Sequence, residues 1–296
     1  MKILLTGANG FVGAWLAAAL LDQGEELLAT GSGDCRLPFT DHPLFHYLSM
    51  ELKDPASIKT TCEGFCPELI IHSGAMSRPD ECELNPELAY SVNVNGTRCL
   101  LEQAERVKSR FIFLSTDFVF DGESGPYKEE DQPAPVNYYG QTKYEAEKSV
   151  MGYGHDWAIV RTILVYGNPI VPRSYLLSIV EGKLKKGESY SLVNDQFRTP
   201  TYVKDLVSGI IAIVNKNAKG IFHLSGEDRM TPYEMGMELA KLKGLDTTLL
   251  KAVTAEIFKE PALRPKSTSF MLDKAKNELD YQPHSFNSAL REMNGY

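Results

Sequence analysis

The chain has 296 residues, of which 43% are hydrophobic and 24% are charged, the composition of a globular protein that buries a core of its own. Its formal net charge of -8 argues against nucleic acid or an anionic membrane as the main partner. The five cysteines are scattered without the spacing of a metal site, so we interpret them as reduced thiols and identify no metal-binding residues, while the use of a divalent metal stays open. No apolar run is long enough to cross a bilayer, and we therefore expect a cytoplasmic protein.

A glycine-rich segment lies near the start of the chain, between a predicted buried strand at residues 2–6 and a predicted helix that ends at about residue 23. Its sequence, G-A-N-G-F-V-G, has the G-x-x-G-x-x-G spacing that lets a backbone turn tightly and approach a diphosphate. A plain tight turn is the alternative, and the position between strand and helix argues against it. We expect a dinucleotide cofactor to bind here through Gly7, Asn9, Gly10, Phe11, Val12 and Gly13.

The second predicted strand, at residues 26–30, bears on the choice of cofactor. In an NAD site an acidic side chain about 20 residues after the glycines usually binds the ribose 2'-hydroxyl. This strand ends in Thr30-Gly31-Ser32, without an acid at its tip. Ser32 and Arg36 could instead bind the 2'-phosphate of NADPH, which is our expectation. Asp34 is close enough in sequence to be the missing acid, so NADH is the alternative.

Two further strand ends complete the expected cofactor site. A third strand is predicted at residues 44–50, and the residues after it would lie near the adenine ring. A fourth strand, at residues 69–72, is followed by small residues that let a cofactor pass closely. A long helix is predicted at residues 86–106. These segments add Glu51, Leu52, Ser73, Gly74, Ala75 and Asn93 to the cofactor-binding candidates.

The alternation of short strands and helices predicts an α/β protein with a doubly wound parallel sheet, the Rossmann fold. We expect residues 1–165 to form the cofactor-binding domain. Regular alternation fades from residue 166, where short strands are predicted at 191–193 and 222–224. We expect residues 166–296 to form mainly a smaller, discontinuous α/β substrate-binding lobe, with a helix near 203–215 returning to the first domain.

The candidate catalytic residues follow a buried strand predicted at residues 111–114, at whose end Thr116 lies. Tyr139 and Lys143 are four residues apart on a predicted helix and therefore share a face. An adjacent ammonium favours the phenolate and lowers the pKa of a tyrosine from ~10, so Tyr139 could exchange a proton near neutral pH. Thr116 could hold the same substrate oxygen. An incidental pair on a surface helix is the alternative, which the strand-end hydroxyl and the glycine segment disfavour.

Several segments together carry a family resemblance: the glycines after Thr6, N-V-N-G-T at 93–97, S-T-D-F-V-F-D-G at 115–122, Y-G-Q-T-K at 139–143, P-T-Y-V-K-D-L at 200–206 and R-P-K at 264–266. With them the chain resembles the extended short-chain dehydrogenase/reductases, and among these the dTDP-4-dehydrorhamnose reductase family. The resemblance implies a catalytic triad of Thr116, Tyr139 and Lys143. It also implies that Tyr139 and Lys143 contact the cofactor, and that NAD(P)H supplies a hydride to a nucleotide-linked 4-keto-6-deoxy sugar.

The substrate contacts expected from the resemblance are Thr116, Asp117, Arg198 and Arg264. Arg198 stands two residues before Pro200, where the family usually carries glycine. It could contact a substrate phosphate or form a structural ion pair, and both interpretations stay open. We expect a nucleotide sugar as the small-molecule partner and consider a homodimer as the assembly.

Two other functions stay open. The segment S-R-P-D at residues 77–80 resembles the regulatory beta subunit of methionine adenosyltransferase, which keeps this fold and a cofactor site. The chain could therefore be a cofactor-binding regulatory subunit. It could also be a sugar-nucleotide epimerase or a reductase of another carbonyl compound, because a fold alone does not determine the function.

Overall fold

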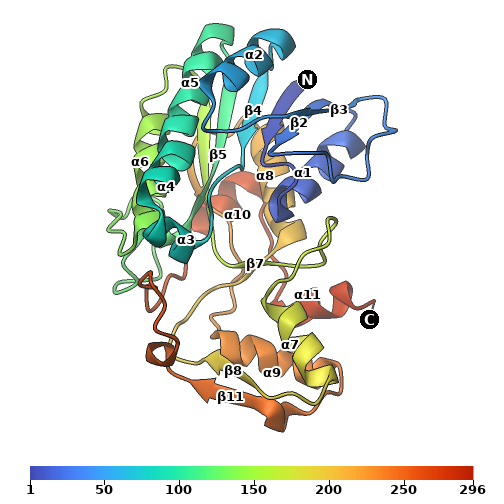
Figure 1. The fold of residues 1–296 in the computed structure, drawn as a ribbon, viewed down its shortest axis with the longest axis vertical. Coiled ribbons are helices and arrows are strands. Elements are labelled where there is room, and N and C mark those ends of the chain that lie inside the picture. The colour runs from blue at the N-terminus through green and yellow to red at the C-terminus, as the bar shows by residue number, and fades with distance from the viewer. Residues whose placement is uncertain (296) are drawn as a thin grey trace.

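The larger domain is built around a parallel seven-stranded sheet, seen in a computed structural model that describes residues 1–295 (Figure 1). The strand order is β3-β2-β1-β4-β5-β6-β10. The strands are β1 Lys2–Thr6, β2 Glu26–Gly31, β3 Phe45–Ser49, β4 Leu69–His72, β5 Arg110–Thr116, β6 Trp157–Thr162 and β10 Gly220–His223. Most are nearly continuous apolar runs, as expected for parallel strands that helices cover on both faces. The predicted doubly wound sheet is confirmed.

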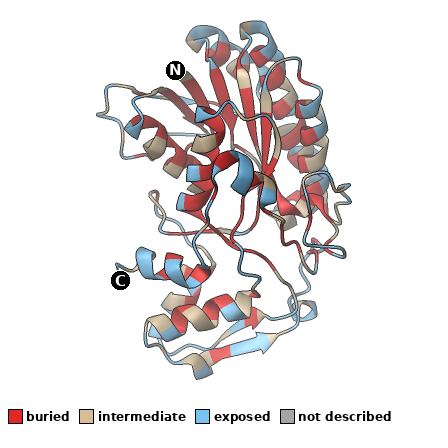
Figure 2. Cartoon of the chain, turned by 180° about the vertical axis from the view of Figure 1, so that it is seen from behind, coloured by how far each residue is buried: buried red, intermediate tan, exposed pale blue. Residues whose placement is uncertain are grey.

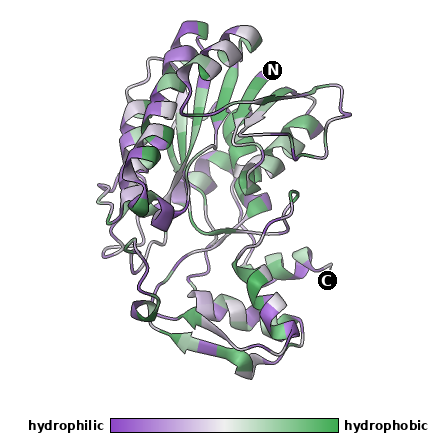
Figure 3. Ribbon diagram, in the orientation of Figure 1, coloured by the Kyte–Doolittle hydropathy of each residue, from purple (hydrophilic) through white to green (hydrophobic). Residues whose placement is uncertain are grey.

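Helices cover both faces of this sheet. One apolar core joins the sheet to α1 (Phe11–Asp22) and α8 (Val203–Asn215), which pack against each other. The other core joins it to α2 (Pro55–Phe65), α5 (Gly96–Val107) and α6 (Tyr138–Met151). The strands are buried along most of their length (Figure 2) and form the most hydrophobic part of the chain (Figure 3).

A smaller lobe lies below the carboxyl ends of the strands (Figure 1). It contains α7 (Leu176–Lys185), α9 (Pro232–Leu242), α11 (Phe286–Met293) and a parallel pair, β8 (Tyr190–Val193) and β11 (Leu250–Val253). A second short pair, β7 (Val165–Tyr166) and β9 (Thr201–Tyr202), links the lobe to the sheet domain. The helix α10 (Asp273–Leu279) returns to pack on α8 and β10. None of the helices in residues 1–295 has both the length and the apolar character needed to cross a membrane.

Three elements differ from the sequence-based expectation. The helix predicted at 86–106 is divided into α4 (Pro86–Tyr90), a π-helical turn (Ser91–Asn95) and α5, and within that turn the side chain of Asn93 bonds to the backbone of Met76. The strand predicted at 222–224 pairs with β6 as the edge of the main sheet. An additional short helix, α3 (Pro79–Leu84), was not predicted.

Helix α6 packs closely on the short 3-10 turn (Asp117–Val119) that follows β5. A Cβ atom added at Gly140 would lie 2.0 Å from the carbonyl oxygen of Phe118. By contrast, a Cβ atom at Gly182, in the middle of α7, would have no heavy atom within 4 Å. These two helical glycines therefore form a matched pair.

We expect Gly140→Ala to lower the free energy of unfolding by about 1–3 kcal/mol, because backbone must move to admit the methyl group. Gly182→Ala should instead raise it by up to ~1 kcal/mol, since alanine is the better helix former and space is free. Urea unfolding of the two variants checks this, and equal stabilities would contradict the close contact of α6 with the turn after β5.

Candidate active site

A cleft of about 970 Å³ lies along the carboxyl ends of the sheet strands, where parallel α/β folds bind ligands. Segments that follow β1, β2, β3, β4 and β5 all contribute to its lining. Among the candidates from the sequence, the residues that line it are Gly7, Asn9, Gly10, Phe11, Val12, Gly13, Ser32, Arg36, Glu51, Leu52, Ser73, Gly74, Ala75, Thr116, Asp117, Tyr139, Lys143 and Arg264. Asn93 and Arg198 lie outside this lining.

The glycine segment forms a tight cradle at the start of α1. Gly7 has a φ of +69°, and a Cβ atom there would lie 2.6 Å from the amide nitrogen of Gly74. A Cβ atom at Gly13 would lie 2.2 Å from the carbonyl oxygen of Gly7. Gly10 is the N-cap of α1 and has no side chain that could cap the helix. The backbone N–H groups in the first turn of α1 therefore stay available to an anion. The cradle therefore fits a diphosphate.

Asn9 organises the loop after β2. Its side-chain amide donates to the carbonyl of Asp34 (3.0 Å) and to the hydroxyl of Tyr47 (2.8 Å), while its oxygen accepts from the backbone N–H of Arg36 (3.0 Å). Arg36 and Ser32 line the cleft, whereas Asp34 is exposed outside it. Asp34 is thus poorly placed to act as the acid of an NAD site. Tyr47, which fixes this loop, was missed because nothing in its sequence context distinguishes it from a strand residue.

The three catalytic candidates come from β5 and α6. Thr116, the last residue of β5, donates to the carboxylate of Asp117 (3.1 Å). Asn137 caps α6 by accepting from the N–H of Gly140 (2.9 Å). Tyr139 and Lys143 are both buried and line the cleft, whereas the neighbouring Tyr138 is not part of its lining.

The electrostatics of this pair differ from the expectation that Lys143 lowers the pKa of Tyr139. Burial raises the pKa of Tyr139 well above its usual value, and the nearby hydroxyl of Thr116 opposes this rise only in part. The ammonium of Lys143 instead donates to the carbonyl of Leu114 (2.7 Å) and lies 3.9 Å from the ring centre of Phe113. Burial lowers the pKa of Lys143 to about 7. The long lysine side chain reaches back to β5, which four-residue spacing alone does not reveal.

Two candidate substrate contacts are engaged with the protein. Arg198 is buried and donates to the carbonyls of Phe197 (2.7 Å) and Pro265 (2.8 Å), with its Nε 3.7 Å from the carboxylate of Asp117. Arg264 lines the cleft, but its guanidinium binds both carboxylate oxygens of Asp80 at 2.7 Å. Arg198 was expected either to contact a substrate phosphate or to form a structural ion pair, and its contacts are those of a structural ion pair.

Asp117 and Asn93 form hydrogen bonds with residues that do not line the cleft. The buried carboxylate of Asp117 also accepts from the hydroxyl of Thr268, and its pKa is raised by burial against the opposing charge of Arg198. Asn93 lies behind the cleft, where its amide donates to Met76 and to the hydroxyl of Thr142 on α6, both at 3.0 Å. Asn93 thus supports the cleft wall rather than forming it.

Several lining residues were not among the candidates. Arg78 lines the cleft from the S-R-P-D segment, whose resemblance to the regulatory subunit implied no role for this arginine. The run from Val171 to Tyr175 lines the cleft from a region where strand and helix alternation fades. No motif marks that run, so only tertiary structure reveals it.

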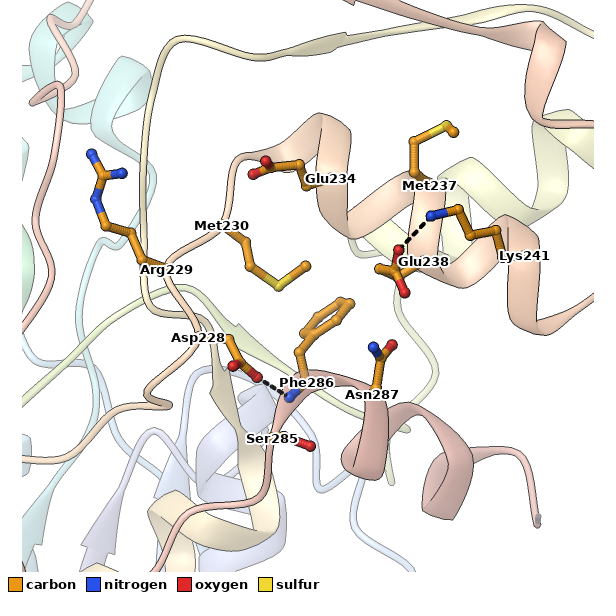
Figure 4. Close-up of a pocket in the computed structure, with 10 residues that line it drawn as sticks. All are labelled: Asp228, Arg229, Met230, Glu234, Met237, Glu238, Lys241, Ser285, Phe286 and Asn287. Atoms are coloured by element: carbon orange, nitrogen blue, oxygen red, sulfur yellow. Dashed lines mark hydrogen bonds and ion pairs between the residues drawn. The ribbon is translucent and has the colours of Figure 1, made fainter.

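A second hollow of about 590 Å³ lies in the smaller lobe between α9 and α11 (Figure 4). Its polar groups already have partners. Asp228 accepts from the N–H of Phe286 (2.6 Å), Glu234 caps the start of α9, and Glu238 pairs with Lys241 (2.8 Å). None of the catalytic candidates lines it. We therefore place the candidate active site in the larger cleft.

Comparison with known proteins agrees with the fold and the cleft. Residues 1–295 match the family described as RmlD substrate binding domain. Methionine adenosyltransferase 2 subunit beta of Xenopus tropicalis is 34% identical over 261 residues, 86% of this chain and 76% of the relative. The probable low-salt glycan biosynthesis reductase Agl14 of Haloferax volcanii is 30% identical over 283 residues, 94% and 92% of the two chains. The structure of dTDP-4-dehydrorhamnose reductase from Bacillus anthracis, in complex with NADP, has a TM-score of 0.87 and 25% identity, covering 99% and 98%.

The fold and the cleft define an extended short-chain dehydrogenase/reductase, a class of NAD(P)-dependent oxidoreductases. Within this class the chain belongs to the RmlD family, which confirms the resemblance predicted from its motifs.

The buried ammonium of Lys143 gives a prediction about stability. Burial holds its pKa at about 7 in the folded chain, against a usual value of 10.5. Below pH 7 the lysine is charged in both the folded and the unfolded chain, so the folded state carries the full free-energy cost of burying an ammonium. Above pH 10.5 the lysine is neutral in both states, and this cost vanishes. Lys143→Met should therefore raise the free energy of unfolding at pH 6.5 by about 1 kcal/mol or more.

This gain should shrink as the pH rises toward 10. Urea unfolding across this range measures it, and Lys148→Met, which removes an exposed lysine of the same helix, should change stability little. A Lys143→Met variant less stable than the parent at pH 6.5 would contradict the assigned burial cost.

Proposed function

We propose that this protein is an NADPH-dependent reductase of a nucleotide-linked 4-keto-6-deoxy sugar, similar in activity to dTDP-4-dehydrorhamnose reductases. The observation that carries the proposal is the convergence of Thr116, Tyr139 and Lys143 on the cleft that also contains the glycine cradle. The relative Agl14 is named a reductase, and the Bacillus anthracis structure is a reductase complex with NADP. Both support assigning reduction to this chain.

The cofactor supplies a hydride that converts a ketone into an alcohol. The carbonyl oxygen then becomes an alkoxide, which a protein stabilises with hydrogen-bond donors and a proton source in a site shielded from water. We assign the proton to the phenol of Tyr139 and the hydrogen bond to the hydroxyl of Thr116. Lys143 would favour the phenolate that remains and hold the nicotinamide ribose, once its ammonium exchanges the Leu114 carbonyl for these partners.

The choice of NADPH rests on the loop after β2. Ser32 and Arg36 face the cleft there, and Asp34 does not. An arginine that binds a 2'-phosphate makes charge-assisted hydrogen bonds that NADH cannot replace.

A regulatory subunit is the second candidate, because methionine adenosyltransferase 2 subunit beta is among the most similar relatives. In the S-R-P-D segment, Asp80 binds Arg264 and the N–H of Ala262, which fixes the chain beside the cleft. That role is structural and would serve an enzyme equally well. A subunit that only binds a cofactor does not need Thr116 and Tyr139 in the cleft.

Replacement of Tyr139 tests the assigned proton donor. Tyr139→Phe keeps the ring and removes the hydroxyl, so cofactor binding should persist while turnover falls by about 10²–10⁴. Tyr138 precedes Tyr139 in the sequence but does not line the cleft, so Tyr138→Phe should leave turnover within about twofold. NADPH oxidation with a dTDP-4-keto-6-deoxy sugar is followed by absorbance, and a Tyr139→Phe variant that keeps more than about a tenth of the activity would exclude this role.

Replacement of Arg36 tests the choice of cofactor. The parent protein should bind NADPH more tightly than NADH, and Arg36→Gln should weaken NADPH by on the order of tenfold while leaving NADH unchanged. Fluorescence titration with each cofactor measures both affinities. A parent protein without any preference for NADPH would show that Arg36 does not bind a 2'-phosphate.

A further inference from the structure

The segment between β7 and α7, residues 168–175, reaches back from the smaller lobe to the start of α1, and we call it the strap. It is the yellow-green loop that rises toward α1 beside β7 (Figure 1). The indole N–H of Trp15 donates to the carbonyl of Asn168 (2.9 Å), and the ring of Tyr175 stacks on that of Phe11 at 6.2 Å and 18°. Since Phe11 and Trp15 both belong to α1, the strap is fixed beside the glycine cradle.

Three arginines from separate segments line the cleft: Arg36 after β2, Arg78 after β4 and Arg173 in the strap. The guanidinium of Arg173 lies 5.9 Å from the ring centre of Phe11. Arg173 stays largely exposed to solvent, and its partial burial in the cleft lowers its pKa, as do the positive charges of Arg78 and Arg36. Arg173 is thus near enough to Arg78 and Arg36 for their charges to act on it.

This positive charge is incompletely neutralised. Arg78 forms an ion pair with Glu81 (2.6 Å). Within residues 1–295, neither Arg36 nor Arg173 has a carboxylate partner. A cation that has no carboxylate partner and lies near like charges is stabilised when an anion binds to it. A phosphoryl group is the anion whose geometry a guanidinium matches best.

We propose that Arg173 binds the diphosphate of the dinucleotide cofactor, closing the glycine cradle from the side of the smaller lobe. This inference rests on the proposed function only in taking a dinucleotide as the occupant of the cleft. Arg173 lies over Phe11, the first residue of α1, whose uncapped N–H groups make the cradle suited to a diphosphate.

The two other phosphoryl groups that could reach the cleft fit Arg173 less well. A 2'-phosphate is expected at Ser32 and Arg36, in the loop after β2 whose backbone is held by the side chain of Asn9. A substrate must present its carbonyl to Thr116 and Tyr139, at the ends of β5 and α6, whereas Arg173 contacts α1.

Because Arg173 lies in the strap, binding of the cofactor would also affect the position of the smaller lobe. The strap leads directly into α7, for which Tyr175 is the N-cap. A diphosphate bound by both the α1 N-terminus and Arg173 therefore fixes the start of α7 relative to the sheet. The lobe that receives the substrate is then ordered by the cofactor.

Cofactor titration of variants tests this assignment. Arg173→Gln should weaken NADPH and NADH by the same factor, roughly tenfold or more, since both contain the diphosphate. Arg173→Lys should recover part of that loss because it keeps the charge without the planar fork. The control Arg291→Gln removes an exposed arginine of α11, outside the cleft, and should change neither affinity. The stabilisation that dTDP alone gives in a thermal unfolding assay should be the same for Arg173→Gln and the parent.

Each other outcome overturns the proposal. Weaker binding of NADPH alone would place Arg173 at the 2'-phosphate. A lost response to dTDP with unchanged cofactor affinities would place it at the substrate. Unchanged affinities throughout would leave it without a phosphoryl ligand. The titrations need no turnover, so a protein that binds cofactor through Arg173 but reduces no ketone would contradict the proposed function and leave this inference intact.

Discussion

Close packing of α6 on the turn after β5 is the contact on which the candidate site depends. Gly140 allows the helix to approach the backbone of Phe118, and the capping bond from Asn137 sets where the helix begins. One turn beyond Lys143, the buried carboxylate of Glu147 binds Arg161 of β6 through two hydrogen bonds, of 3.0 and 2.7 Å. This ion pair fixes α6 to the sheet, and the charge of Glu147 favours the ammonium of Lys143.

A second constraint is the attachment of the smaller lobe to this edge. Asp117, directly after Thr116, accepts a hydrogen bond from Thr268, and Asp80 binds Arg264 on both carboxylate oxygens. Residues far apart in the sequence are thus joined at the cleft. Buried or half-buried pairs of this kind are costly to break singly, because the remaining charge loses its partner. The lobe is therefore positioned by polar contacts that adjoin the catalytic candidates.

Local sequence patterns predicted the elements and the edge of the sheet at which the site forms. The glycine spacing, the strand-end Thr116 and the pair Tyr139 and Lys143 each depend on periodicity within a single element. Long-range partners could not be predicted in this way. Neither the contact of Lys143 with Leu114 nor the contacts of Arg198 has a local signal. The edge strand β10 is only four residues long, so its membership of the main sheet is decided by tertiary packing.

Transfer of isotope tests the central claim, that the cleft carries hydride from a cofactor to a sugar ketone. NADPH deuterated at either face of nicotinamide C4 is incubated with the purified protein and a dTDP-4-keto-6-deoxy sugar, and the product is analysed by mass spectrometry and NMR. We predict that one of the two labelled cofactors gives a product with deuterium at the sugar C4 and the other gives none. A cofactor that binds but transfers no label from either face would contradict the account and favour a regulatory role.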